Sequence, residues 1–295
     1  LIAELRDGGR FRVLEDLAEI TRLGQGVDGS SNIGPEAEQR SLEVLQGYLR
    51  HCQDLGVEEI HAVGTSALRD AANSGEVRAR FKQRLGLDIR VLSGGEEAAY
   101  AFLAVQRGLS LSGQELLGID IGGGSTEFIW GDDGGIRRAV SLNVGSVRLT
   151  ERFLRADPVT EEECGRVTEA IDRELGVLRA SAEQAPAAKM IGIAGTFTTL
   201  AAVEKRLVRY SHSDVHGSRL TLAAVRRQRQ LFQGKTIIER KKIAGLEPKR
   251  ADVILAGAIL IERIMTRFRT DEVIVSDQGV RYGLLYERLK RVLFC

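Results

Sequence analysis

Several features that mark specialised protein classes are scarce in this sequence. Three cysteines, Cys52, Cys164 and Cys295, lie far apart among 295 residues and form no CxxC motif. This spacing excludes a dense disulfide framework and favours a reducing, cytoplasmic environment. No apolar run approaches the ~20 residues of a membrane-spanning helix, and no secretory signal peptide is evident. Lys plus Arg (42) nearly cancels Asp plus Glu (41), so we expect neither a membrane nor nucleic acid as partner.

The rest of the sequence alternates between strand-like and helix-like segments. Strands are predicted at 1–5, 11–23, 59–63, 89–92, 116–121, 126–130, 136–144, 190–193 and 273–275. Helices are predicted at 35–55, 96–105, 161–178, 250–268 and 280–292. Such alternation predicts an α/β fold. The length suggests two domains, and the polar segment 108–114 sets the boundary between 1–112 and 113–295.

A hairpin pattern occurs in both halves. Gly8-Gly9 and Gly134-Gly135 each separate two predicted strands. In the second half a further strand and a glycine loop precede the hairpin. If the halves are duplicates, we expect an equivalent strand and loop before Leu1.

The most informative motif is DIGGGSTE at 120–127, between two predicted strands. Three glycines allow positive φ angles and close approach of a ligand to the backbone. Successive N–H groups in such a turn suit phosphate oxygens. Asp120 and Glu127 flank the turn and are suited to a hard cation such as Mg²⁺. The motif fits neither a P-loop nor a dinucleotide fingerprint, which leaves a metal-assisted phosphate site or a plain hairpin turn.

The segment Ser93-Gly94-Gly95-Glu96-Glu97 follows a predicted strand and starts a helix. Ser93 and Glu96 fit a capping box, which leaves Glu97 without a capping role. A carboxylate in the first turn of a helix can polarise a water molecule or simply complement the helix dipole. Both explanations remain open for Glu97.

Other Gly/Ser/Thr-rich starts of predicted helices are candidate anion sites. They contain Arg69, Gly145, Ser146, Arg148, Gly195 and Thr196. A basic group further on, Lys235, Arg240, Lys241, Lys242, Lys249 and Arg250, offers either a path for a polyanion or a solvated face. His212 and His216 have metal-like spacing, but no third ligand is evident, so we expect structural or exposed histidines.

Taken together, these motifs resemble those of the exopolyphosphatase/guanosine pentaphosphate phosphohydrolase (Ppx/GppA) family. The matching segments are GTSALRDA at 64–71, LSGGEEA at 92–98, DIGGGSTE at 120–127, VGSVR at 144–148, GT at 195–196, GLEPKRAD at 245–252 and SDQGVR at 276–281. They occur in order along nearly the whole chain. The family normally opens with a strand and an Asp-x-Gly-Ser/Thr-Asn-Ser loop, and this chain starts just after that position. It resembles the short, two-domain members, which lack an HD-type extension.

The resemblance implies two actin-like (ribonuclease H-like) domains with an interdomain cleft, the last helix, about 280–295, packing back on the N-terminal domain. It implies that Glu97 activates water and that Asp120 and Glu127 hold Mg²⁺ or another divalent cation such as Mn²⁺. The residues expected along the phosphate path are Arg69, Gly122, Gly123, Gly124, Ser125, Gly145, Ser146, Gly195 and Thr196. A homodimer is compatible with the short form.

Four functions remain open at this point. The first is metal-dependent removal of the terminal phosphate of inorganic polyphosphate, and the second is the same reaction on guanosine pentaphosphate. The third is an actin-like ATPase or kinase, in which the glycine loops hold ATP. The fourth is a non-catalytic polyphosphate-binding protein.

Overall fold

The computed structural model of the chain describes residues 1–6, 10–111, 113–178 and 188–293. The predicted Gly8-Gly9 turn, Ser112 at the predicted domain boundary and Cys295 lie outside these ranges. By packing, the chain divides into two compact units, which we call unit 1 (Leu1–Glu97 and Leu284–Cys295) and unit 2 (Ala98–Gly283). Among the described helices, none is both long and apolar enough to cross a lipid bilayer.

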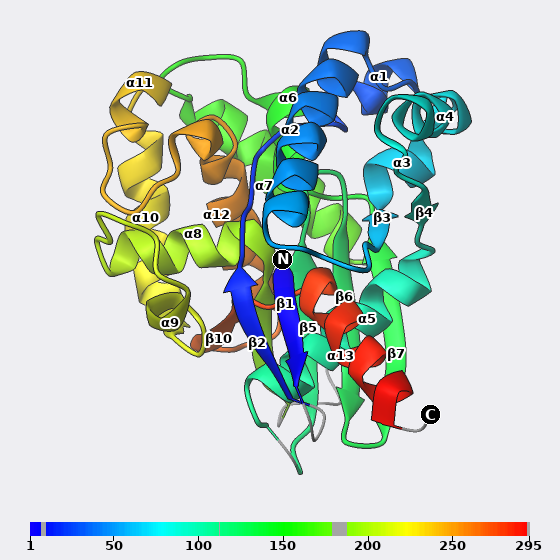
Figure 1. Ribbon diagram of the computed structural model, residues 1–295. Helices are drawn as coiled ribbons and strands as arrows, with labels where there is room; N and C mark the ends of the chain where they lie inside the picture. The colour runs from blue at the N-terminus through cyan, green and yellow to red at the C-terminus, as the bar shows by residue number, and fades with distance from the viewer. Residues whose placement is uncertain (7–9, 112, 179–187, 294–295) are drawn as a thin grey trace. The chain divides into compact units, whose positions relative to one another are not determined.

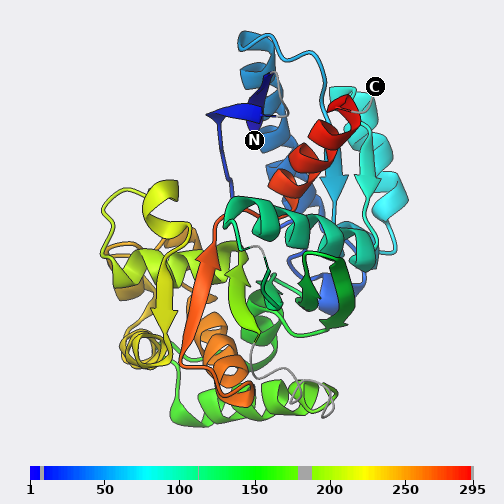
Figure 2. The same cartoon turned by 90° about the horizontal axis from the view of Figure 1, so that it is seen from below.

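Within the described residues, unit 2 is built on a six-stranded mixed sheet in the order β7-β6-β5-β8-β10-β9. The strands are β5 (Leu116–Ile121), β6 (Thr126–Asp132), β7 (Gly135–Leu142), β8 (Lys189–Ile193), β9 (Arg219–Thr221) and β10 (Glu272–Ser276). β5, β8 and β10 are parallel, whereas β6, β7 and β9 run antiparallel to their neighbours. Figure 2 shows β8, β10 and β9 side by side. The carboxyl ends of the parallel strands therefore meet at one edge of the sheet.

Helices cover both faces of this sheet. One face is covered by α6 (Ser146–Phe153), α7 (Glu161–Leu175), α8 (Ala194–Glu204), α9 (His212–Val215), α10 (Leu222–Gln233), α11 (Ile237–Arg240) and α12 (Ile254–Arg267). Leu117, Ile119 and Ile121 of β5 pack in the large core with α7, α8 and α12. Leu116 lies in the opposite core, which contains Ala98, Phe102 and other residues of α5 (Gly94–Gly108). Alternate side chains of β5 thus reach opposite faces.

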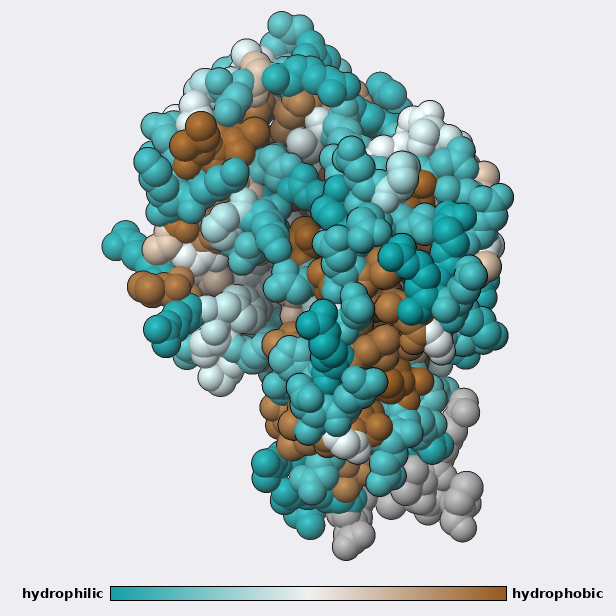
Figure 3. Space-filling model, turned by 45° about the horizontal axis from the view of Figure 1, so that its top comes forward, coloured by the Kyte–Doolittle hydropathy of each residue, from teal (hydrophilic) through white to brown (hydrophobic). Residues whose placement is uncertain are grey.

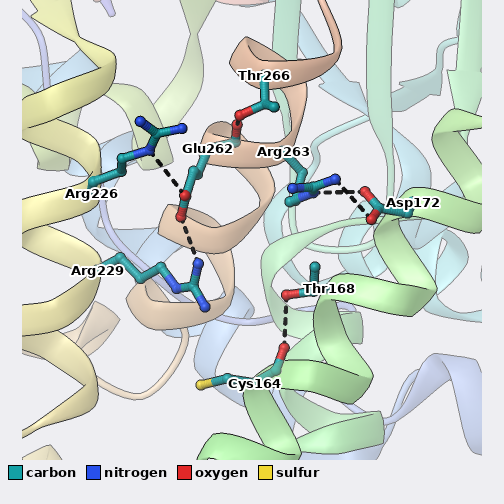
Figure 4. A network of polar contacts seen from close by, with 8 residues as sticks. All are labelled: Cys164, Thr168, Asp172, Arg226, Arg229, Glu262, Arg263 and Thr266. Carbon is teal, nitrogen blue, oxygen red and sulfur yellow. Dashed lines mark hydrogen bonds and ion pairs between the residues drawn. The ribbon is translucent and has the colours of Figure 1, made fainter.

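Helix α12 is the central helix of the large core. Its residues 254–262 are all buried, and salt bridges connect its last turns to both neighbouring helices (Figure 4). Glu262 accepts bonds from Arg226 and Arg229 of α10 at 3.3 and 2.8 Å. Arg263 donates two bonds, of 2.7 and 2.9 Å, to Asp172 of α7. The predicted helix began at residue 250, but a separate 3-10 turn, Pro248–Arg250, precedes α12.

Unit 1 combines two small sheets with several helices (Figure 1). β1 (Ile2–Arg6) and β2 (Arg10–Glu15) are antiparallel, and β3 (Ala62–Gly64) and β4 (Ile89–Val91) are parallel. The helices are α1 (Val27–Ser30), α2 (Pro35–Asp54), α3 (Ser66–Asp70), α4 (Ser74–Leu85) and the end of α13 (Val280–Leu293). The strand predicted at 11–23 is shorter in the structure. β2 ends at Glu15, where its pairing with Ile2 of β1 ends.

The division between the units falls within α5 rather than in the polar segment after it. The sequence-based boundary was placed after residue 112, where the glycines and serines read as a linker. In the structure α5 runs unbroken from Gly94 to Gly108, and its apolar face from Ala98 onward packs on the sheet of unit 2. Because of this packing, the division between the units falls after residue 97. Local composition does not reveal such packing.

Hydrophobic side chains are exposed at several places among the residues that the structure describes. Large apolar side chains such as Val208 and Ile238 are exposed, and Figure 3 shows hydrophobic groups scattered between hydrophilic residues on one face. Scattered apolar exposure of this kind is normal for folded proteins. The candidate functional groups are instead polar residues at the ends of strands.

Candidate active site

The first candidate is the junction between β4 and α5 in unit 1. The predicted capping box is confirmed there. The Glu96 N–H donates to Ser93 Oγ at 3.2 Å, and the Ser93 N–H and hydroxyl donate to Glu96 Oε2, both at 2.9 Å. The bonds from the Ser93 backbone and hydroxyl lower the pKa of Glu96. Glu96 therefore serves the helix start, and the side chain of Glu97 is left for another role.

Glu97 is held by an arginine from a different element. Its Oε2 accepts a bond of 2.9 Å from Nη1 of Arg69, at the end of α3. The side chain of Glu97 is only 13% exposed and that of Arg69 is 26% exposed. Partial burial strengthens such an ion pair relative to one on the surface. The structure thus brings together two residues for which the family resemblance implies separate roles, in water activation and in phosphate binding.

The second candidate is the carboxylate pair of unit 2. Asp120 on β5 and Glu127 on β6 are direct partners in the antiparallel register. Such partners share one face of a sheet, with Cβ atoms ~4.5–5.5 Å apart. Glu127 is buried and accepts a bond of 2.8 Å from the hydroxyl of Ser141, its partner on β7. Register therefore explains how two carboxylates seven positions apart in sequence meet.

This pair suits a hard divalent cation. Mg²⁺ is usually bound through one or two carboxylates and completes its coordination with water and substrate phosphates. The described ranges contain no group of three or more His, Cys, Asp or Glu side chains that could hold a metal. The donor set therefore fits an ion shared with a phosphate better than a closed structural site.

The glycine loop between β5 and β6 presents unpaired backbone donors. Among the residues that the structure describes, the N–H groups of Gly123, Gly124 and Ser125 donate no hydrogen bond, whereas that of Gly122 donates to Ser125 O at 3.0 Å. Consecutive N–H groups without protein partners form a site for an anion. They lie beside the carboxylate pair because the loop directly joins Ile121 to Thr126.

Helix α6 fixes the position of this loop. The N–H groups of Ser146, Val147 and Arg148 donate to the carbonyl oxygens of Gly122 and Gly123 at 3.0 to 3.1 Å. Arg148 Nε also donates to Gly124 O at 2.7 Å. The sequence had suggested these groups as donors to an anion, but in the structure they bind the loop. The assignment of Gly145 and Ser146 to the phosphate path stays a prediction.

The glycines of the loop serve close approach rather than an unusual backbone conformation. None of Gly122, Gly123 and Gly124 has a positive φ, although three glycines would allow one. A Cβ on Gly145 would collide with the carbonyl group of Gly123. Gly145 is therefore required because two backbone segments touch there.

A third strand end, between β8 and α8, has a strained backbone. Ala194 adopts a φ of 69°, which is unfavourable for a residue with a side chain. A Cβ on the next residue, Gly195, would collide with the guanidinium group of Arg250. Thr196 is buried. Strain of this kind often occurs at functional sites, although the roles of Gly195 and Thr196 stay predictions.

The two histidines contact the segment that follows β10. His212 Nδ1 is paired with a carboxylate oxygen of Asp277. The backbone N–H of Asp277 donates to Nδ1 of His216 at 3.2 Å. These contacts connect α9 to the end of β10, a pairing that the sequence did not predict because 65 residues separate His212 from Asp277.

The structure contradicts the prediction for one residue of the basic group, Arg240. Arg240 is 1% exposed, and its guanidinium donates to Phe232 O at 2.7 Å and to Ala251 O at 3.3 Å. Burial lowers the pKa of Arg240. This arginine therefore cannot line a surface path for a polyanion. Lys241 and Lys242 are exposed, and their part in such a path stays a prediction.

Comparison with known proteins identifies the family of this chain. The Ppx/GppA phosphatase family model matches residues 1–292. Exopolyphosphatase 2 of Mycobacterium tuberculosis H37Rv is 32% identical, over 96% of this chain and 92% of that protein. A guanosine-5'-triphosphate,3'-diphosphate pyrophosphatase of Vibrio atlanticus is 28% identical, over 95% of this chain and 54% of that protein.

Solved structures give the same result. The crystal structure of the Aquifex aeolicus Ppx/GppA family member is 34% identical with a TM-score of 0.81, covering 98% of this chain and 92% of that one. This likeness defines the class of the protein as an α/β protein of actin-like fold, as the family resemblance implied. The chain belongs to the Ppx/GppA phosphatase family.

Proposed function

We propose that this chain hydrolyses the terminal phosphoanhydride bond of inorganic polyphosphate and releases orthophosphate, with the help of a divalent metal ion. The observation that carries the proposal is the loop at 122–125. Its three unpaired N–H groups lie beside the Asp120–Glu127 carboxylate pair. Unpaired amides and paired carboxylates together suit a metal-bound phosphate. The similarity to a mycobacterial exopolyphosphatase over most of both chains supports this substrate class.

Each group of unit 2 has a distinct part in the proposed reaction. Asp120 and Glu127 would hold Mg²⁺ or a similar cation such as Mn²⁺, and Ser141 fixes the orientation of Glu127. A bound cation of this type neutralises charge on phosphoryl oxygens. The amides of Gly123, Gly124 and Ser125 donate to the same oxygens. Positioning and electrostatic stabilisation of this kind provide most of the catalysis in phosphoryl transfer.

Glu97 supplies the base. Its carboxylate orients a water molecule toward the terminal phosphorus and accepts the water proton as the P–O bond to the chain breaks. The capping box leaves Glu97 free for this task, and Arg69 holds its carboxylate. General-base catalysis typically contributes ~10²–10⁴-fold. A reducing, cytoplasmic setting belongs to the same proposal, because Cys52 and Cys164 are free thiols.

Guanosine pentaphosphate is the second candidate substrate. Its terminal phosphate would meet the same residues, and the Vibrio atlanticus relative is named for hydrolysis of this nucleotide. The chain is 32% identical to the exopolyphosphatase and 28% identical to this relative. The higher identity favours polyphosphate.

The test is orthophosphate release from long-chain polyphosphate and from guanosine pentaphosphate, measured in parallel with Mg²⁺ or with EDTA. We expect metal-dependent release with a higher kcat/KM for polyphosphate. A higher kcat/KM for guanosine pentaphosphate would transfer the proposal to the second substrate. Release from neither substrate would contradict both.

A further inference from the structure

The short helix α9 contacts the turn after β10 at two points, and both lie on Asp277. Nδ1 of His212, the first residue of α9, is paired with the carboxylate of Asp277. Nδ1 of His216, the residue after α9, accepts a bond of 3.2 Å from the backbone N–H of Asp277. The side chain of Asp277 is 12% exposed. Two histidines four positions apart thus hold both the carboxylate and the main chain of one residue.

The two contacts make different demands on the proton at Nδ1. His216 accepts, so its Nδ1 carries no proton and the proton of the neutral ring lies on Nε2. A carboxylate only accepts, so Nδ1 of His212 donates to Asp277 whether the ring is neutral or charged. When both rings gain a proton, the bond of His212 is kept, whereas Nδ1 of His216 becomes a donor that faces the N–H of Asp277. Acid therefore breaks one contact and not the other.

The surroundings of His216 do not compensate for a second proton on the ring. Nε2 is buried and has no hydrogen-bond partner in the part of the chain that the structure describes. Toward α5 the ring is covered by Gly108, since a Cβ on Gly108 would overlap Oε1 of Gln278 and lie 3.2 Å from Cε1 of His216. Neither Gly108 nor Gln278 carries a charge. Charge on a buried group without a partner is strongly unfavourable.

Carboxylates on the other neighbouring elements already have partners. These pairs are Glu204 of α8 with Arg227, Glu272 of β10 with Arg219 of β9, and Asp277 with His212. Asp214, on α9 itself, is exposed, where solvent and salt screen its charge. Among the described residues of these elements, the carboxylates are therefore paired or screened, and a proton on His216 gains little from them.

The turn that α9 holds lies beside the end of β8. Ser276, the last residue of β10, is the register partner of Ile193 on β8. A Cβ on Gly279, in the same turn, would lie 3.5 Å from the side chain of Ile193. The next residue, Ala194, begins α8 with a φ of 69°, and such a conformation persists only when its surroundings enforce it. The position of the turn therefore bears on the start of α8.

We propose that α9 is a pH-sensitive latch on the turn after β10. The latch is closed while His216 is neutral and opens when the ring gains a proton, as the pH falls through the range near ~6.5 in which histidine ordinarily titrates. Opening releases the backbone of Asp277 and loosens the start of α8, and with it the binding of phosphate at Gly195 and Thr196. The latch stands on contacts within unit 2 alone, whereas its effect on phosphate rests on the proposed function.

Two substitutions at position 216 separate the proton from the bond. His216→Asn keeps an oxygen acceptor near the place of Nδ1 and does not titrate, whereas His216→Ala removes the acceptor at every pH. His61→Asn is the matched control, because it removes an exposed histidine that is paired with a carboxylate, Glu59, in unit 1. The measurements are Tm, the amide resonance of Asp277 by NMR and the affinity for tripolyphosphate, each between about pH 5 and 8.

On acidification from pH ~8 to ~5, Tm of the wild type should fall by about 3 °C more than Tm of His216→Asn. The Asp277 amide should shift in the wild type but not in this variant, and His216→Ala should already have a lower Tm at pH ~8. The ratio of the wild-type Kd for tripolyphosphate to the Kd of His216→Asn should rise about 10-fold. This ratio removes the titration of the ligand itself. His61→Asn should follow the wild type in every measurement.

An Asp277 amide that shifts equally in the wild type and in His216→Asn, or equal losses of Tm, would overturn the latch. A ratio of Kd values that does not change with pH would overturn its effect on phosphate. If neither the wild type nor any variant binds tripolyphosphate at any pH, the proposed function fails instead, and Tm and the amide resonance still decide the latch.

Discussion

The β4–α5 junction of unit 1 and the β5–β6 hairpin of unit 2 both combine glycines with carboxylates, yet they use them differently. At the junction the two carboxylates are neighbours in sequence and have separate tasks. Glu96 closes the capping box, and Glu97 binds Arg69. In the hairpin the two carboxylates, Asp120 and Glu127, are partners across two strands.

The two regions show two ways in which polar groups can be left available for a ligand. At the junction a second carboxylate takes over the capping role, so that Glu97 is available. In the hairpin the first turn of α6 donates to the loop carbonyls, and the amides of Gly123, Gly124 and Ser125 have no partner among the described residues. The first arrangement depends on side chains, and the second on close packing of backbone. Substitutions should therefore affect the two regions in different ways.

The largest effect is expected where Glu97 and Glu96 are compared directly. Glu97→Gln should lower kcat by about 10²–10⁴-fold, because the general base is lost. Glu96→Gln should leave kcat within about threefold of wild type and slightly lower Tm, because only the capping bond is weakened. Steady-state kinetics and thermal melts measure both. A larger loss of kcat in the Glu96 variant would mean that the two roles are assigned to the wrong residues.

The backbone packing of the hairpin can be broken at Gly145. Gly145→Ala should lower kcat by about 10²-fold, because the added Cβ collides with Gly123 and displaces the loop. The matched control is Gly165→Ala on α7, where a Cβ meets nothing within 4 Å. That change should keep activity and add up to about 1 kcal/mol of stability. Full activity in the Gly145 variant would show that the loop position is unimportant.

A smaller effect should follow from the hydroxyl that orients Glu127. Ser141→Ala removes the bond of 2.8 Å to Glu127 and should raise the Mg²⁺ concentration for half-maximal activity by about 10-fold. At saturating Mg²⁺, kcat should recover. Thr168→Ala, which removes a hydroxyl bonded only within α7, serves as control. An unchanged Mg²⁺ requirement would argue against Glu127 as a ligand.

The smallest effect on activity is expected at Glu163, another capping carboxylate. Burial alone would raise the pKa of Glu163, but backbone bonds from Thr160, Arg155 and Ala156 outweigh it and lower the pKa from 4.5 to about 2. Its contribution to stability is therefore present above pH ~4.5 and is lost as the pH falls toward ~2.

Glu163→Gln should destabilise the fold by about 1–3 kcal/mol at pH 7 with kcat unchanged. The destabilisation relative to wild type should shrink as the pH falls toward ~2. Urea unfolding at several pH values provides the measurement. A difference that does not depend on pH would contradict the charged capping role.

Local signals in the sequence predicted much of the fold and part of the candidate site. Apolar strand patterns located β5 and β8, and the Ser93–Glu96 spacing predicted the capping box. These features depend on residues close in sequence, where periodicity and capping chemistry apply. The resemblance of ordered motifs predicted the family.

Contacts between distant residues could not be predicted in this way. The Arg69–Glu97 bond joins positions 28 residues apart, and the burial of Arg240 depends on carbonyl groups of two other segments. Nor does the glycine-rich pattern at Gly122–Gly124 distinguish a positive φ from a need for close contact between backbone segments. Charged residues near each other in sequence suggested a surface group, although packing decided otherwise for Arg240.

The central claim, attack of water on the terminal phosphorus, is tested most directly by a single turnover of polyphosphate in ¹⁸O-labelled water with Mg²⁺. The account predicts one solvent oxygen in each released orthophosphate and none in the shortened chain, with Glu97→Gln nearly inactive. Label in the shortened chain, or transfer of the phosphoryl group to an added acceptor instead of water, would contradict it.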